Sequence, residues 1–108
     1  MGQIQWISVS KDVPIKVEVS DDEPSWDSMR EFIGGGYLEH VSILMPDGSR
    51  AHMFVDEEGL LKDFAFNVRA TEHYWRASLT QKGFLVPPTP IVGPAILLVN
   101  IPIEGYDF

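Results

Sequence analysis

The chain has 108 residues, 44% of them hydrophobic and 22% charged, and it carries a formal net charge of -8. These values predict one folded domain with its own hydrophobic core and argue against general disorder. The acidic surplus repels nucleic-acid phosphates, so direct binding to nucleic acid is not expected. The sequence contains no cysteine and no run of about 18 apolar residues, which excludes disulfides, thiolate metal sites and a membrane-spanning helix.

The first 20 residues predict an N-terminal pair of strands. Ile4–Val9 alternates weakly between apolar and polar residues, and Val13–Val19 alternates clearly with a period of two, which is typical of a strand with one buried face. We expect the whole chain to form a single domain, with this strand pair in residues 1–20, a core in residues 25–101 and a short tail in residues 102–108.

A helix is predicted over Trp26–Ile33, with Ser25 as its N-cap and Gly34 directly after its last turn. Gly34, Gly35 and Gly36 then precede a strand. A phosphate-binding loop places its glycines before a helix and adds a lysine, so helix termination is the favoured interpretation of this run. A ligand-binding or partner-binding role for the three glycines stays open.

A β-hairpin is predicted next, with Tyr37–Met45 and Arg50–Asp56 on either side of an Asp47-Gly48 turn. Apolar residues on both faces of the first strand predict that it lies in the interior of the sheet. The relative position of His40 and His52 depends on register. If Met45 pairs with Arg50, the two histidines lie on opposite faces, and a shift of one residue places them on one face, two positions apart.

The remainder of the chain predicts a second helix and a final strand. Residues 60–66 fit a strand, a short helix or a loop. The second helix begins at Val68 or Glu72, is capped by Asn67 or Thr71, and ends near residue 79. A proline-rich connector follows it, and Ala95–Ile101 is an apolar run of the right length for a buried interior strand. The expected fold class is therefore α+β, a single small domain in which two helices pack on a mixed or antiparallel sheet.

The sequence shows no catalytic constellation. Its serines lie in no nucleophile-elbow context, and its histidines do not provide the three or four converging ligands of a metal site. We therefore expect no catalytic residues, no metal and no cofactor, and a protein that is not an enzyme, although a catalytic site without a motif stays open.

One junction offers groups suited to an anionic ligand or a partner. Asn67, Arg69 and Thr71 place an amide, a guanidinium and a hydroxyl where a loop enters the second helix, and free backbone N–H groups at a helix start favour anions. The alternative is that Asn67 and Thr71 cap the helix and that Arg69 is solvated.

Four segments in this order carry a family resemblance: Ile33–Glu39, Val55–Lys62, Asn67–Thr71 and Ile91–Ala95. Over about residues 30–99 the chain resembles a family of small domains of unknown function (domain of unknown function 3846) carried by phages, plasmids and their bacterial hosts. The resemblance implies an accessory protein of a mobile element. The first residues lack the basic start and apolar block of a signal peptide, so we expect a location in the cytoplasm of the host cell. The resemblance implies no catalytic residues.

The leading hypothesis is a non-enzymatic phage or plasmid protein that binds a host protein and counteracts host defence. A second hypothesis is a binding domain for a small anionic or nucleotide-like ligand, with the glycine run and the Asn67 junction as its site. A third is an acidic inhibitor that mimics nucleic acid. Its acidic surface would consist of Asp21, Asp22, Glu23, Asp27 and Glu31. The sequence does not predict the oligomeric state.

Overall fold

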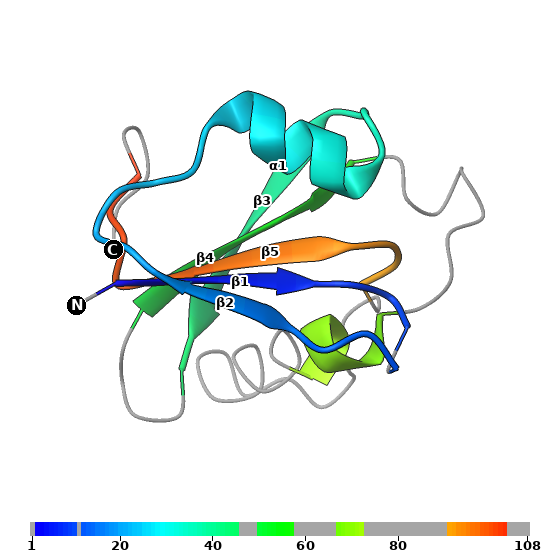
Figure 1. Cartoon of the computed structure of the whole chain (residues 1–108), viewed down its shortest axis with the longest axis horizontal. Coiled ribbons are helices and arrows are strands. Elements are labelled where there is room, and N and C mark those ends of the chain that lie inside the picture. The colour runs from blue at the N-terminus through cyan, green and yellow to red at the C-terminus, as the bar shows by residue number, and fades with distance from the viewer. Residues whose placement is uncertain (1, 11, 46–49, 58–66, 73–90, 104–108) are drawn as a thin grey trace.

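The computed structural model describes residues 2–10, 12–45, 50–57, 67–72 and 91–103 (Figure 1). Its elements, in chain order, are β1 (Gln3–Ile7), β2 (Lys16–Val19), α1 (Trp26–Ile33), β3 (Leu38–Leu44), β4 (Arg50–Asp56) and β5 (Ala95–Val99), with a short helical segment at residues 68–72 between β4 and β5. The Asp47-Gly48 turn, residues 60–66, the rest of the second helix, the proline-rich connector and residues 104–108 lie outside the described residues.

The five strands form one sheet in the order β2-β1-β5-β4-β3, and all four pairings are antiparallel. An α+β domain with an antiparallel sheet and two short helices is therefore confirmed. The interior position predicted for Ala95–Ile101 is confirmed as well, since β5 lies between β1 and β4 (Figure 1). β5 ends at Val99 because the next residue, Asn100, has a positive φ of 55°.

The interior position predicted for Tyr37–Met45 is wrong, because β3 is an edge strand. Val41 and Ile43 of this strand belong to the hydrophobic cluster on one face of the sheet, and Leu38 belongs to the cluster on the other face. Apolar residues on both faces of a strand thus indicate that both faces of the sheet are covered. They do not indicate whether the strand pairs with one neighbouring strand or with two.

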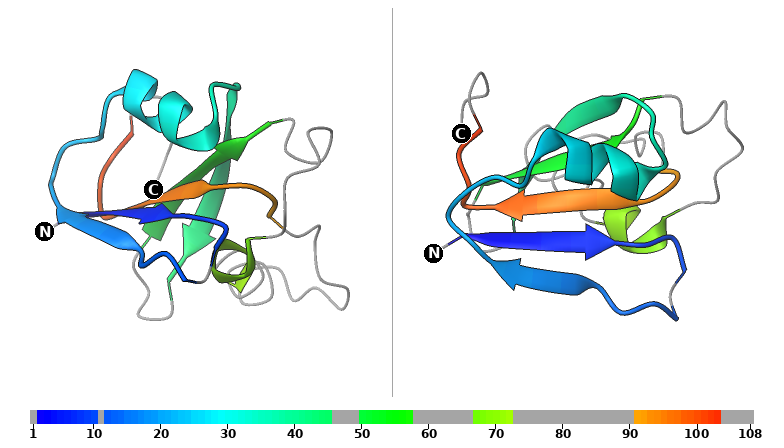
Figure 2. Two further views of the ribbon diagram at one scale, coloured as in Figure 1. Left: turned by 45° about the vertical axis from the view of Figure 1, so that its right-hand side comes forward. Right: turned by 45° about the horizontal axis from the view of Figure 1, so that its top comes forward.

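The core consists of two clusters separated by the sheet, and the alternation of β5 shows the division. Ile96 and Leu98 face α1 and cluster with its buried residues Met29 and Ile33, so this side is called the α1 face. The neighbours of Ile96 and Leu98 along β5 belong to the cluster on the opposite face, which also contains Ala70 of the second helix. Figure 2 shows α1 on one side of the sheet and the 68–72 segment on the other.

The bounds of α1 agree with the prediction because both of its ends are encoded locally. The Ser25 hydroxyl accepts a hydrogen bond from the backbone N–H of Ser28, which caps the first turn. Gly34 lies in the left-handed region with φ 104°, and the N–H groups of Gly34 and Gly35 donate to carbonyls of the last helical turn. Glycine reaches this backbone conformation without a steric cost.

A Gly34→Ala substitution is expected to lower the free energy of unfolding by about 1 kcal/mol, because an alanine side chain is strained at this positive φ. Gly36 is not among the glycines with positive φ. The Gly36→Ala variant is therefore the matched control and is expected to change the stability little. Urea denaturation measures both variants, and equal midpoints would contradict the assigned helix end.

Candidate functional site

The three residues predicted to bind an anion near the second helix make structural contacts. Asn67 is fully buried, and its Oδ1 accepts from the backbone N–H of Ala70, so Asn67 is the N-cap. Its Nδ2 donates to the carbonyls of Ile7 at 3.1 Å and Gly93 at 3.0 Å. Asn67 therefore joins the end of β1, the start of the second helix and the segment before β5.

Thr71 and Arg69 extend this set of contacts. The Thr71 hydroxyl donates to the carbonyl of Ile91 and accepts from the N–H of the same residue. The Arg69 guanidinium donates to three backbone carbonyls in the loop between β1 and β2, those of Ser8 (2.8 Å), Ser10 (2.9 Å) and Val13 (3.0 Å). Arg69 thus holds this loop in place. The alternative in which Arg69 is merely solvated is wrong, because its guanidinium is bound to the backbone of this loop.

The glycine run lies away from this junction. Gly34–Gly36 follows α1 on the α1 face, whereas Ala70 of the second helix packs in the cluster on the opposite face. The N–H groups of Gly34 and Gly35 already donate to helix carbonyls, and the carbonyls of Gly35 and Gly36 accept from Arg30. The structure therefore does not bring the two halves of the predicted ligand site together, and anion binding by either half stays a prediction.

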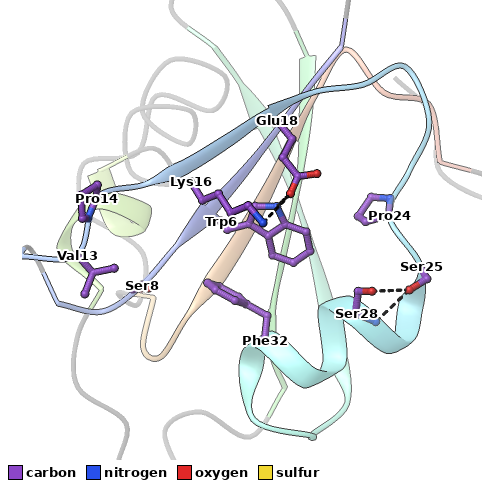
Figure 3. Close-up of a pocket in the computed structure, with 10 residues that line it drawn as sticks. All are labelled: Trp6, Ser8, Val13, Pro14, Lys16, Glu18, Pro24, Ser25, Ser28 and Phe32. Atoms are coloured by element: carbon purple, nitrogen blue, oxygen red, sulfur yellow. Dashed lines mark hydrogen bonds and ion pairs between the residues drawn. The ribbon is translucent and has the colours of Figure 1, made fainter.

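A pocket of about 550 Å³ opens on the α1 face, between the first turns of α1 and the strands β1 and β2 (Figure 3). We call it the Trp6 pocket. Its lining residues are Trp6, Ser8, Val13, Pro14, Lys16, Glu18, Pro24, Ser25, Ser28 and Phe32. Its volume lies within the range of roughly 300–1,000 Å³ that is usual for small-ligand and side-chain pockets.

Two aromatic side chains and one carboxylate give the Trp6 pocket its chemistry. The rings of Trp6 and Phe32 meet edge to face, with their centroids 5.2 Å apart. The Trp6 indole Nε1 donates to Glu18 Oε1 at 3.1 Å, which fixes the carboxylate beside the ring (Figure 3). Aromatic rings next to a carboxylate suit a flat apolar group or the cationic end of a lysine or arginine.

The ion pair of Glu18 with Lys16 is easily exchanged for another one. Lys16 Nζ lies 3.1 Å from Glu18 Oε1, and the two side chains are 73% and 41% exposed. An ion pair with this exposure contributes about 1 kcal/mol or less, because water screens it. A cation brought by a partner can therefore replace Lys16 at Glu18 at little cost.

The sequence did not single out Trp6, Phe32 or Glu18. Trp6 and Phe32 occupy the apolar positions of a predicted strand and helix, and Glu18 occupies a polar position of the next strand. No local sequence pattern indicates that α1 packs over β1 and β2. The sequence alone therefore could not show that these three side chains lie together.

Arg69 connects the predicted junction to the Trp6 pocket. Ser8 and Val13 line the pocket, and their carbonyls are two of the three that Arg69 holds. Arg69 itself does not line the pocket. Its position indicates a structural role in shaping one wall of the pocket.

The two histidines of the central hairpin form a pair. Leu44 pairs with Arg50, so His40 and His52 lie on the α1 face as diagonal neighbours, which is the second of the two predicted registers. His40 Nε2 and His52 Nδ1 are 2.6 Å apart, close enough for one ring to donate to the other. Burial lowers the pKa of both rings below 6.5, and the proximity of His40 lowers the pKa of His52 further.

The His40–His52 pair predicts a loss of stability on acidification. Unfolded histidine titrates near 6.5, and both folded pKa values lie lower, so the unfolded state takes up protons first as the pH falls below about 6.5. The free energy of unfolding should then decrease by at most about 1.4 kcal/mol per pH unit for each ring. Urea midpoints between about pH 7.5 and pH 5.5 measure this slope. A His40→Gln/His52→Gln variant with the same slope as the wild type would contradict the assignment.

Among the described residues, no group of three or more histidine or acidic side chains is placed to hold a metal ion. Within the same residues, no helix has the length and apolar character needed to cross a membrane.

Comparisons with family models, with curated proteins and with solved structures find no match for the chain. The resemblance to small mobile-element domains therefore stays a prediction.

Proposed function

We propose that this protein is a non-enzymatic binding protein that holds a segment of a partner protein in the Trp6 pocket. The observation that carries the proposal is the pocket itself, in which Trp6 and Phe32 form aromatic walls and Glu18 presents a carboxylate beside them. A lysine or arginine side chain of the partner fits this chemistry, because its stem packs on the rings and its charged end pairs with Glu18.

The surface next to the pocket favours a basic partner. Asp21, Asp22 and Glu23 are exposed in the segment between β2 and α1, and Asp27 is exposed in the first turn of α1. Trp26, at the start of the same helix, is 45% exposed and offers apolar contact area. An acidic surface around an aromatic pocket increases the rate of encounter with a basic segment and orients it.

We further propose that the partner is a host protein and that the chain acts in the cytoplasm of a bacterial host as an accessory protein of a phage or plasmid. The resemblance to small mobile-element domains supports this context. Interference with host defence is the activity that such a context favours for a binding protein without catalytic groups.

A second candidate function is mimicry of nucleic acid by the acidic surface. The exposure of Asp21, Asp22, Glu23, Asp27 and Glu31 supports it. Mimicry and pocket binding differ in which carboxylates matter. Mimicry depends on the exposed acidic residues collectively, whereas pocket binding depends on Glu18.

Affinity capture from host lysate, with mass spectrometry of the bound proteins, tests both functions. Glu18→Gln keeps the shape of the pocket and an oxygen that accepts from Trp6 but removes the charge. Glu31→Gln is the matched control, because Glu31 is an exposed carboxylate of α1 that does not line the pocket. A third variant changes Asp21, Asp22 and Glu23 together to Asn, Asn and Gln.

Binding in the pocket predicts that Glu18→Gln lowers the yield of a captured protein about tenfold, as expected for the loss of one charge-assisted contact, and that Glu31→Gln retains it. Mimicry predicts instead that Glu18→Gln retains the captured protein, that the triple variant loses it, and that added salt weakens its capture steeply. A partner retained equally by all three variants would contradict both functions.

A further inference from the structure

β2 forms one edge of the sheet, and its outer side faces no other described strand (Figure 2, right). The Ser20 N–H donates to the Gly2 carbonyl, so Ser20 directs its backbone groups toward β1. In an antiparallel ladder these directions alternate. Lys16 and Glu18 therefore also direct their N–H and C=O groups toward β1, whereas Val17 and Val19 direct theirs away from the sheet.

The side chains at this edge separate by face. Val17 and Val19 are 50% and 68% exposed on the face opposite α1, so the buried face predicted for Val13–Val19 is wrong at these two residues, because no described element covers that side of β2. Lys16 and Glu18 lie on the α1 face, where they form their ion pair at the rim of the Trp6 pocket. The edge thus combines backbone groups that face no other described strand, an apolar face and one charge of each sign.

This edge is complementary to itself in one register. In an antiparallel pair of two β2 strands, residues whose backbone groups point away from β1 must lie opposite each other. The allowed registers therefore differ by steps of two residues. With Val17 opposite the Val17 of the second copy, each Lys16 lies opposite a Glu18, and each Val19 lies opposite an Ile15. The two adjacent registers place Lys16 opposite Lys16 or Glu18 opposite Glu18, which is unfavourable.

We propose that the protein dimerises through β2, with Val17 on the two-fold axis and the two sheets joined into one. The axis of such a pairing is perpendicular to the sheet, so the two α1 helices and the two Trp6 pockets lie on the same face of the dimer. The dimer presents two acidic, aromatic pockets side by side. This inference goes beyond the proposed function and does not depend on it.

Sedimentation equilibrium over a concentration series into the millimolar range, combined with charge reversal, tests the pairing. The wild type is expected to reach twice its monomer mass of 12.1 kDa. Lys16→Glu alone sets two carboxylates opposite each other in both cross-strand pairs, and Glu18→Lys alone sets two ammonium groups opposite each other in both. Each single variant should dimerise about tenfold more weakly than the wild type.

An equimolar mixture of the two single variants is the decisive sample. In the mixed dimer a carboxylate of the Lys16→Glu chain lies opposite an ammonium group of the Glu18→Lys chain in both cross-strand pairs, so the mixture should associate better than either component alone and about as well as the wild type. The Lys16→Glu/Glu18→Lys double variant restores opposite charges in both pairs, and its association should recover to that of the wild type. A double variant that associates no better than the single variants, or a wild type that stays monomeric throughout, would overturn the proposal.

Val17→Pro supplies a second test that leaves the side chains of the Trp6 pocket unchanged. The proline removes an N–H that points away from β1, so the internal ladder is retained while pairing at the axis is lost. The expected result is a monomer at every concentration, with the circular dichroism of the wild type. A Val17→Pro chain that dimerises as the wild type does would overturn the proposal and leave the Trp6-pocket function untouched.

Discussion

Replacing Asn67 with alanine is expected to lower the free energy of unfolding by about 3 kcal/mol, a large part of the total for a domain of this size. The side chain is fully buried and makes three hydrogen bonds, accepting from Ala70 and donating to the carbonyls of Ile7 and Gly93. Its removal deletes the helix cap and leaves two carbonyls without their donor in the protein interior. Urea denaturation at neutral pH measures the effect.

Asn67→Asp separates the cap from the donated bonds, because it keeps the shape and the oxygen that accepts from Ala70. It replaces the donating amide with an oxygen that faces two carbonyls, which raises the pKa of the new carboxyl and destabilises the fold at neutral pH. Its stability relative to the wild type should therefore improve as the pH falls and the carboxyl becomes protonated. An Asn67→Ala variant within about 0.5 kcal/mol of the wild type would show that these bonds are not formed.

Arg69→Met is expected to lower the free energy of unfolding by about 2 kcal/mol, since it removes the donors to Ser8, Ser10 and Val13 and retains the apolar length of the side chain. Arg69→Lys is the matched control for charge. A single ammonium lacks the planar fork that reaches three carbonyls, so this variant should recover only part of the loss.

The Arg69 variants also distinguish a structural arginine from an anion-binding one. A structural role predicts reduced stability together with weaker partner capture, because Ser8 and Val13 line the Trp6 pocket. An anion-binding role predicts nearly unchanged stability and the loss of phosphate binding, which phosphate titration followed by NMR measures. A fully stable Arg69→Met chain would contradict the contacts assigned here.

The parts of the fold predicted correctly are those encoded by local chemistry. The bounds of α1 follow from the Ser25 cap and the positive φ of Gly34, and the bounds of β4 follow from its apolar run before an acidic turn. Sheet order is not a local property. Tyr37–Met45 has the composition of a covered strand, but its place at the edge is determined by which strands pair with β4 and β5.

The Trp6 pocket was not predicted from the sequence, because it too depends on contacts between distant parts of the chain. Asn67 was correctly predicted as a possible cap, because a cap needs only residues three positions apart. The Trp6 pocket depends on Trp6, Glu18 and Phe32, which come from three elements brought together by the tertiary fold. The glycine run and the Asn67 junction are prominent in the sequence, yet each forms contacts on a different face of the sheet.

The most direct test of the proposed function is photocrosslinking from inside the Trp6 pocket. Benzoylphenylalanine is placed at Ser28, which lines the pocket, and in a control chain at Val68, which is exposed on the second helix beyond the opposite face. Both chains are irradiated in host lysate, and the adducts are identified by mass spectrometry. A specific protein adduct from position 28, absent from position 68 and reduced by Glu18→Gln, is the predicted result. An adduct formed from position 68 alone would contradict binding in the pocket.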